Sequence, residues 1–427
     1  MSDKKRNVPV LRFNGFSDAW EQRKLGDIVF KAVDNRGKTP PLDVNGPHPL
    51  LEVVSLGQGY PDYSKVTKYV NTETYNSWFR NHIKENDALF STVGNTGLVS
   101  IMDDFMGATI AQNIVAFRAH EQYSSRFFYT MMQLSSNQKK IKKIEMGAVQ
   151  PSIKVSQLIH VYFNVSTEIE EQIKIGHFFK LLDNIIALHQ RKLDALKQMK
   201  KGFLQQLFPE SGEKLPRARF TGFQEEWEQR EFGDILIFSV PNNNFPRASL
   251  NYEEGIIKNI HYGDVLMKFD SVVDVSTSNI PFVTNGQLES FTNQFLQNGD
   301  IVIADTAEDK ITGKAIEVCG INNTSVVSGL HTMVARPNIS FASRYLGYYL
   351  NSYSYRKQLL PLMQGIKVLS ISKSNISKTT LCFPKNVIEQ ERIGDFFKQL
   401  DKTMLLHQNR LTKLTTLKKA YLKIMFI

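Results

Sequence analysis

The chain has 427 residues, of which 42% are hydrophobic. A chain of this length is longer than a single hydrophobic core usually organises. Its net charge of +10 favours a polyanionic partner. Two cysteines are too few for a disulfide framework, the first residues lack the apolar core of a signal peptide, and no run of 18 apolar residues could span a membrane. We therefore expect a two-domain cytoplasmic protein with no membrane segment.

The first motif of the chain returns 207 residues later. Residues 20–28 read WEQRKLGDI and residues 227–235 read WEQREFGDI, and a short RFxGF stretch precedes each. A match of this length indicates a tandem duplication, so each half is expected to fold alike.

A mixed segment of about 150 residues follows each opening motif. Residues 256–260 and 301–304 are β-type runs, and Gly, Asn and Pro punctuate both segments, which predicts short strands and turns. A helical pattern covers residues 125–144 in the first copy and 343–360 in the second. The offset between matched positions then grows from 207 to 218, so the second copy has gained 11 residues inside its globular part.

Each copy ends in a long helical pattern. Residues 169–208 and 387–426 share 18 identities in 40, and one set of positions recurs at alternating spacings of four and three. This period of 3.5 residues predicts a coiled-coil seam. The seam positions are Leu182, Ile186, His189, Leu193 and Leu196 in the first helix and Leu400, Met404, His407, Leu411 and Leu414 in the second.

Polar residues interrupt both seams at matched positions. His189 and His407 are too few to hold a metal ion, so we expect a polar layer that fixes the helix register. Lys200 and Lys418 either act in the same way or extend to solvent. The two helical segments carry +6 of the net charge of +10, which is either a solvated face or a basic side near a phosphate backbone.

The repeat predicts an α+β fold: two similar mixed α/β domains joined by two long antiparallel coiled-coil helices, as a pseudo-twofold tandem repeat. The expected boundaries are 1–165 and 219–383 for the domains, 166–208 and 384–427 for the helices, and 209–218 for a linker. A helix over 182–207 would be about 39 Å long. One turn of B-DNA is about 34–36 Å, so the helices are predicted to act as a ruler between two DNA-reading domains.

Matched positions that are identical are predicted to be scaffold, as for Trp20 and Trp227 or Gly26 and Gly233. Base-reading positions should differ between the copies. Arg and Lys read guanine and Asn and Gln read adenine in the major groove, and these residue types occur in turns of both middles. The candidates are Arg36, Lys38, Gln58, Asn95, Gln112, Asn113 and Gln150 in the first copy and Asn243, Arg247, Lys258, Lys310, His331 and Lys367 in the second, with Asn242 and Asn244 beside them.

Two motifs invite catalytic interpretations. Residues 32–39 match a relaxed phosphate-binding loop, but Pro40 and Pro41 follow at once and disfavour the helix that such a loop needs. This stretch is better interpreted as a basic loop that contacts DNA or as a plain surface loop. Residues 305–309 resemble a metal nuclease constellation, but the matched turn at 93–95 has no carboxylates. We therefore expect no catalytic residues, metal site or bound cofactor in this chain.

The number and order of these motifs resemble the specificity (S) subunits of type I restriction-modification systems. The resemblance rests on the twin WEQRxxGDI openings, on GAVQPSI at 147–153, and on EQxxIGxFFKxLD at the start of both long helices, and it covers nearly the whole chain. It implies two target-recognition domains that each read one half of a bipartite sequence in double-stranded DNA. It also implies two methyltransferase (M) subunits carrying S-adenosylmethionine, and restriction (R) subunits that use ATP with Mg.

The alternative is a two-ended protein scaffold that does not read DNA. It requires similar surfaces on both domains, whereas the middles of the copies have diverged. A self-contained adenine methyltransferase is disfavoured because the chain lacks the Asn/Asp-Pro-Pro-Tyr/Phe motif that holds a flipped base. The sequence therefore predicts a non-catalytic DNA-reading subunit.

Shortening both long helices by one heptad is expected to change the spacer of the recognised DNA sequence and to leave both half-sites unchanged, because the ruler shortens while the reading domains stay intact. Adenine-methylation mapping by single-molecule sequencing measures both quantities. Altered half-sites would contradict the ruler.

Overall fold

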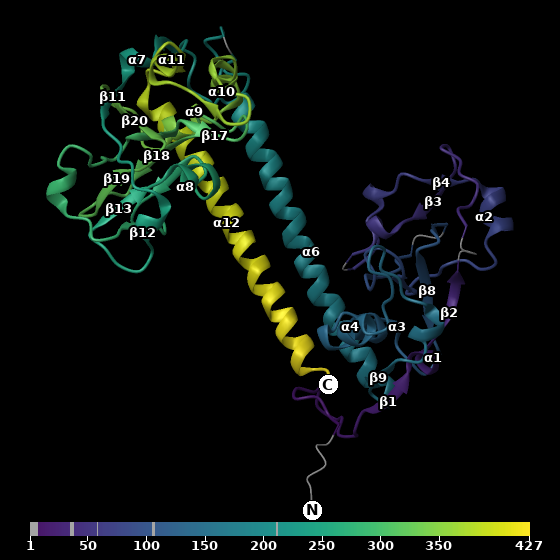
Figure 1. The fold of residues 1–427 in the computed structure, drawn as a ribbon. Coiled ribbons are helices and arrows are strands. Elements are labelled where there is room, and N and C mark those ends of the chain that lie inside the picture. Colours follow the sequence, from purple (N-terminus) through teal and green to yellow (C-terminus); the bar gives the residue numbers. More distant parts are fainter. Residues whose placement is uncertain (1–6, 35–37, 58, 105–106, 211) are drawn as a thin grey trace, which may run out of the picture. The chain divides into compact units, whose positions relative to one another are not determined.

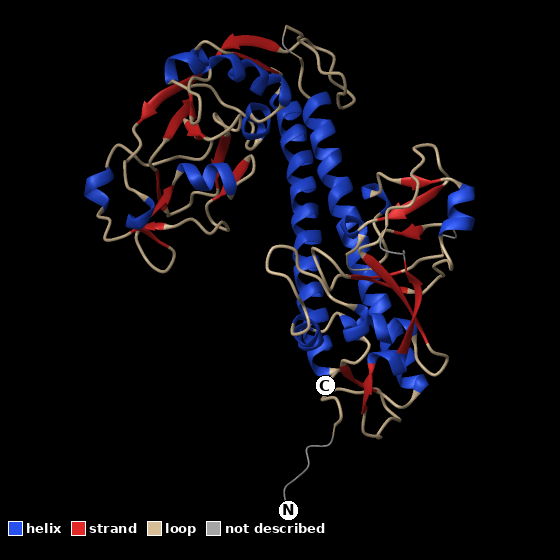
Figure 2. Ribbon diagram, turned by 45° about the vertical axis from the view of Figure 1, so that its right-hand side comes forward, coloured by secondary structure: helices blue, strands red, loops and turns tan. Residues whose placement is uncertain are grey.

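The computed structural model describes residues 7–34, 38–57, 59–104, 107–210 and 212–427, which form two compact units. Unit 1 comprises residues 1–191 and 408–427, and unit 2 comprises residues 192–407. Each long helix is divided between the units. In each unit, short strands and helices gather into a globular part beside its segments of the long helices (Figure 2).

The globular part of unit 1 is a mixed domain of short elements (Figure 1). Its strands are β1 (Glu21–Lys24), β2 (Val29–Asp34), β3 (His48–Leu51), β4 (Tyr69–Val70), β5 (Ala88–Ser91), β6 (Val99–Ile101), β7 (Thr109–Ile110), β8 (Ile114–Ala119) and β9 (Tyr162–Val165). Its helices are α1 (Leu25–Ile28), α2 (Thr72–Trp78), α3 (Ser125–Met132), α4 (Ser135–Lys142), α5 (Val155–Leu158) and the first part of α6 (Ile169–Gln206). The strands form the sheets β2-β8-β5-β6 and β4-β3-β7 and the ribbon β1-β9.

The globular part of unit 2 is also mixed. Its strands are β10 (Glu228–Glu231), β11 (Leu236–Val240), β12 (Leu250–Asn251), β13 (Ile257–Ile260), β14 (Val272–Asp274), β15 (Phe282–Val283), β16 (Ile301–Ala304), β17 (Thr306–Ala307), β18 (Ala315–Cys319), β19 (Ser325–Ser328), β20 (Thr332–Pro337), β21 (Leu369–Ser370) and β22 (Thr380–Phe383). Its helices are α7 (Phe232–Ile235), α8 (Tyr262–Met267), α9 (Tyr345–Leu350), α10 (Tyr353–Leu359), α11 (Lys373–Ser377) and the first part of α12 (Val387–Ile424). The sheets are β11-β20-β16-β18-β14, β12-β15-β13-β19, β10-β22 and β17-β21.

The two units share one topology. The order β2-β8-β5-β6 returns as β11-β20-β16-β18, and the ribbon β1-β9 returns as β10-β22. The parallel pair β3-β7 has its counterpart in β13-β19. The structure therefore confirms the predicted α+β repeat, and the β-type run at Ile301–Ala304 is strand β16.

A buried glutamate fixes each opening motif to the start of a long helix. Glu171 of α6 accepts hydrogen bonds from Arg12 at 2.6 Å and from the indole Nε1 of Trp20 at 3.0 Å. Glu389 of α12 accepts the matched hydrogen bond from Arg219 at 2.6 Å. Burial disfavours the charge on Glu171, but Arg12, Ser166 and Trp20 together outweigh it and lower the pKa of that carboxyl.

The long helices pair in antiparallel fashion within each unit. In unit 1, Lys418 near the end of α12 forms an ion pair with Asp183 in the first half of α6, at 2.6 Å. In unit 2, Lys200 near the end of α6 forms an ion pair with Asp401 in the first half of α12, also at 2.6 Å. Both lysines are buried, so they form internal ion pairs and do not extend to solvent.

The pattern over 125–144 predicts one helix, but the structure has two, α3 and α4, and α9 and α10 likewise divide 343–360. Side-chain amides end the first helix of each pair. Asn137 and Gln138 donate to the carbonyl oxygens of Met131 and Met132, and Asn351 donates to that of Gly347. Within the described ranges, no helix is long and apolar enough to cross a membrane.

The matched tryptophans provide a test of the glutamate contact. Trp227 is as buried as Trp20, but its indole nitrogen has no hydrogen-bond partner among the described residues. Trp20→Phe should therefore lower the free energy of unfolding of unit 1 by about 1–3 kcal/mol more than Trp227→Phe lowers that of unit 2, because Glu171 loses a donor. Hydrogen exchange in urea reports each unit separately. Equal losses would show that the indole hydrogen bond contributes nothing.

Candidate nucleic-acid interface and helix grooves

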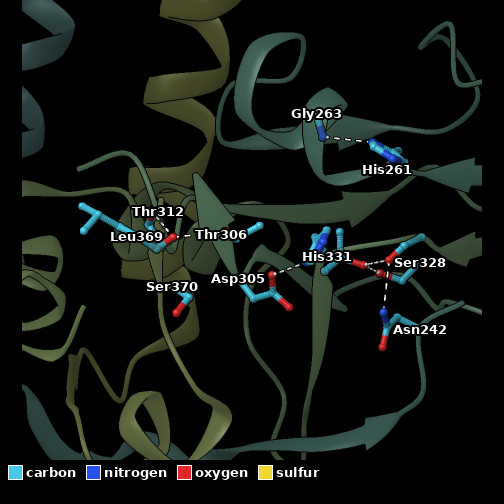
Figure 3. A network of polar contacts seen from close by, with 12 residues as sticks. Asn242, His261, Gly263, Asp305, Thr306, Thr312, Ser328, His331, Leu369 and Ser370 are labelled. Carbon is cyan, nitrogen blue, oxygen red and sulfur yellow. Dashed lines mark hydrogen bonds and ion pairs between the residues drawn. The ribbon is translucent and has the colours of Figure 1, made fainter. Parts of the chain in front are cut away.

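Four loops of unit 2 meet beyond the ends of its strands, and we call them loop face 2. The backbone N–H of Asp305 donates to the carbonyl oxygen of His331 at 3.2 Å, and the N–H of Ile371 donates to that of Asp305 at 2.9 Å. The N–H of Asn243 donates to the carbonyl oxygen of Ser328 at 2.9 Å. Loop face 2 comprises residues 241–247, 305–313, 329–331 and 364–370. Figure 3 labels residues from each of these segments, among them Asn242, Asp305 and His331.

The matched loops of unit 1 are tied by the same backbone bonds and form loop face 1. The N–H of Thr92 donates to the carbonyl oxygen of Asn113 at 2.8 Å, and the N–H of Ile153 donates to that of Thr92 at 2.8 Å. The hydroxyl of Thr39 donates to the side chain of Gln112 at 3.1 Å. Loop face 1 comprises residues 38–39, 92–97, 112–113 and 147–152.

Loop face 1 holds five of the seven candidates predicted for the first copy. Lys38, Asn95, Gln112 and Gln150 are exposed there, and Asn113 is half-buried. Arg36 and Gln58 lie outside the described residues. The bonds between the loops therefore bring together candidates that are up to 112 residues apart in the chain.

Loop face 2 exposes four of the candidates of the second copy, namely Arg247, Lys310, His331 and Lys367. Asn243 belongs to the same face but is buried, and its side chain donates to the carbonyl oxygen of Ser328 at 2.9 Å. This bond ties two loops together, so the geometry favours a structural role for Asn243.

Two candidates of the second copy are held by contacts within the domain. Arg247 forms an ion pair with the buried carboxylate of Asp264 at 2.6 Å. The ammonium group of Lys258 donates to the carbonyl oxygen of Val275 at 2.9 Å. These contacts tie both cations to other groups of the domain.

The centre of loop face 2 contains a carboxylate that did not figure among the candidates. Asp305 directly follows β16, and its Oδ1 lies 3.3 Å from Nδ1 of His331 (Figure 3). Burial raises the pKa of Asp305 above its ordinary value, although His331 and Lys373 act in the opposite direction. The sequence did contain a signal for this residue, because the matched position in the first copy is the uncharged Thr92.

Apolar side chains stand at one turn of each loop face. Val149 is 99% exposed and Ile366 is 101% exposed. Val149 lies two residues after Gly147 and Ile366 directly after Gly365, and both glycines are in the left-handed region, with φ +89° and +120°. A Cβ on Gly147 would lie 2.6 Å from the carbonyl oxygen of Gln150, so the turn requires glycine there.

No group of three or more His, Cys, Asp or Glu gathers for a metal ion in the described part of the chain. Glu308 and Asp309 are exposed, and Asp309 accepts the backbone N–H of Ile311 at 2.8 Å as a turn residue does.

A second duplicated feature lies on the long helices. A groove of about 600 Å³ in unit 1 and one of about 540 Å³ in unit 2 are lined by residues that match at an offset of 218. The matched pairs are Thr415/Lys197, Lys418/Lys200, Lys419/Lys201, Leu422/Leu204, Lys423/Gln205, Gln133/Asn351 and Ser135/Tyr353. We call them groove 1 and groove 2. Each has an apolar floor and a rim of lysines.

Comparison with known proteins gives the family of the chain. Residues 17–198 and 224–416 match the type I restriction modification DNA specificity domain, once in each copy. The type I restriction enzyme MjaVIII specificity subunit of Methanocaldococcus jannaschii is 20% identical over 99% of this chain and 95% of its own length. A putative type I restriction enzyme MjaX specificity subunit of the same organism is 23% identical over 59% of this chain and 61% of its own length.

Solved structures have the same fold. The S subunit of a type I restriction-modification system from M. genitalium superposes with a TM-score of 0.62 at 14% identity, over 98% of this chain and 99% of that one. A chain from a study of complex assembly and conformational transition in the type I restriction-modification system gives 0.50 at 15% identity, over 95% and 97%. The predicted resemblance is thereby confirmed, and this chain belongs to the specificity subunits of type I restriction-modification systems.

Proposed function

We propose that loop face 1 and loop face 2 each read one half of a bipartite DNA sequence. The observation that carries this proposal is that matched backbone hydrogen bonds hold loops whose side chains differ. The N–H of Thr92 donates to the carbonyl oxygen of Asn113, as the N–H of Asp305 donates to that of His331. A frame that stays constant while its exposed side chains change is what two readers of different half-sites require.

The exposed residues of the two faces suit contact with duplex DNA. Asn95, Gln112 and Gln150 offer amides for adenine edges, and Lys310 and Lys367 offer cations for guanine or phosphate. Val149 and Ile366 offer apolar contact to thymine methyl groups. In this proposal residues 1–165 and 219–383 are the reading domains, 209–218 is the linker, and the long helices over 166–208 and 384–427 set the separation of the half-sites.

We further propose that groove 1 and groove 2 dock equivalent segments of two methyltransferase subunits. Matched linings suit two copies of one partner, whereas the loop faces have diverged. An apolar floor with a lysine rim suits an amphipathic segment that carries acidic residues. The methyltransferase subunits would bring S-adenosylmethionine, the restriction subunits would bring ATP with Mg, and the complex would act on DNA in the cytoplasm.

The proposed reading of DNA predicts a new split methylation motif when this chain and its cognate methyltransferase subunit are co-expressed in a methylation-free host. Single-molecule sequencing of the host DNA measures it. Replacing residues 219–383 by those of another member of the family should change one half of the motif and keep the other. A stable complex that yields no motif would favour the protein scaffold without DNA readout.

The grooves predict the stoichiometry of the complex. Lys201→Glu in groove 2 or Lys419→Glu in groove 1 should leave one methyltransferase copy bound, and the double variant none, because the rim then repels an acidic segment. Native mass spectrometry counts the subunits. Lys192→Glu and Lys413→Glu are matched controls, since both lysines are exposed on the same helices but line neither groove. Full assembly of the double variant would contradict the docking proposal.

A further inference from the structure

The centre of loop face 2 differs chemically from that of loop face 1 at one pair of positions. In both units the backbone N–H of the first residue donates to the carbonyl oxygen of the second, at 2.8 Å for Thr92 and Asn113 and at 3.2 Å for Asp305 and His331. The residue that follows the first one pairs with a serine, as Val93 with Ser152 in unit 1. The two pairs of side chains are therefore held on one frame, and only their chemistry differs.

The side chains of Asp305 and His331 face one another, and both remain accessible to solvent. Oδ1 of Asp305 lies 3.3 Å from Nδ1 of His331, and the side chains are 30% and 50% exposed (Figure 3). Among the described residues, none donates a hydrogen bond to the second carboxylate oxygen, Oδ2 of Asp305. His331 has a φ of +54° in the turn before β20, an uncommon conformation for a residue other than glycine.

A carboxylate in such a place has few partners on DNA. Phosphates repel it, so on a face that docks a duplex it must meet a donor on a base edge. In the major groove the exocyclic amines are the donors, on cytosine N4 and on adenine N6. Adenine carries the acceptor N7 beside its amine, which repels a carboxylate, whereas cytosine presents its N4 amine without an acceptor of its own.

We propose that Asp305 accepts a hydrogen bond from the N4 amine of a cytosine in the half-site read by unit 2, with His331 as the residue that positions its carboxylate. This inference rests on the proposed function of the loop faces. It makes Asp305 a specificity-determining residue of unit 2. The matched pair Thr92 and Asn113 has no carboxylate, so unit 1 reads a different base from the same place on its frame.

The test is methylation mapping of variants of the full chain, each co-expressed with the cognate methyltransferase subunit. Asp305→Asn should lose preference for cytosine at one position of the second half-site, by about 5- to 150-fold, and leave the first half-site unchanged. His331→Asn should weaken the same preference at the same position. Glu289→Gln, an exposed carboxylate of unit 2 outside loop face 2, is the matched control and should leave the motif unchanged.

A double variant protects the test against loss of folding. Asp305→Thr with His331→Asn installs the side chains that the frame of unit 1 already holds, and it should give the second half-site a new base at that one position. A variant that lowers methylation equally at all sites without changing the motif would show a purely structural role and overturn the inference. If the wild-type chain still gave a clear motif in that experiment, the proposed function would stand although the inference had failed. If the wild-type chain gave no motif, the inference and the proposed function would both be overturned.

Discussion

The rest of the structure depends on the buried glutamate at the start of each long helix. The side chains of Glu171 and Glu389 are 0% and 1% exposed, and a buried charge without a partner is strongly destabilising. Arg12 and Arg219 supply that partner from the opening motifs. A buried ion pair adds little net stability, so its effect is positional: it fixes where each domain begins relative to its helix.

The neighbouring glutamine completes this joint. Gln172 accepts the backbone N–H of Ser124 at 2.9 Å and donates to the carbonyl oxygen of Ser166 at 2.8 Å. Gln390 makes the same two bonds in unit 2, with Ala342 and Pro384. The pair Glu-Gln therefore connects the helix to three separate segments of its domain, which explains why these residues are identical in both copies.

Sequence patterns predicted the elements that are determined locally. The duplication, the long helices and the scaffold role of Trp20 and Trp227 follow from identities and spacing. The burial of Asn243 could not be predicted in this way, because its partner Ser328 lies 85 residues away. A base-reading role for Asp305 could not be predicted either, because its position at the centre of a face follows from bonds between distant loops.

The two kinds of duplicated surface differ in what the two copies have in common. Groove 1 and groove 2 share lysines and a leucine at matched positions, as the proposed docking of one partner at both grooves requires. Loop face 1 and loop face 2 keep their backbone bonds and change their side chains. Because the bonds that hold the loops run between backbone atoms, side chains at positions such as 92 and 305 can change without loss of the frame. New DNA specificity can therefore arise on one face while the joints and grooves stay intact.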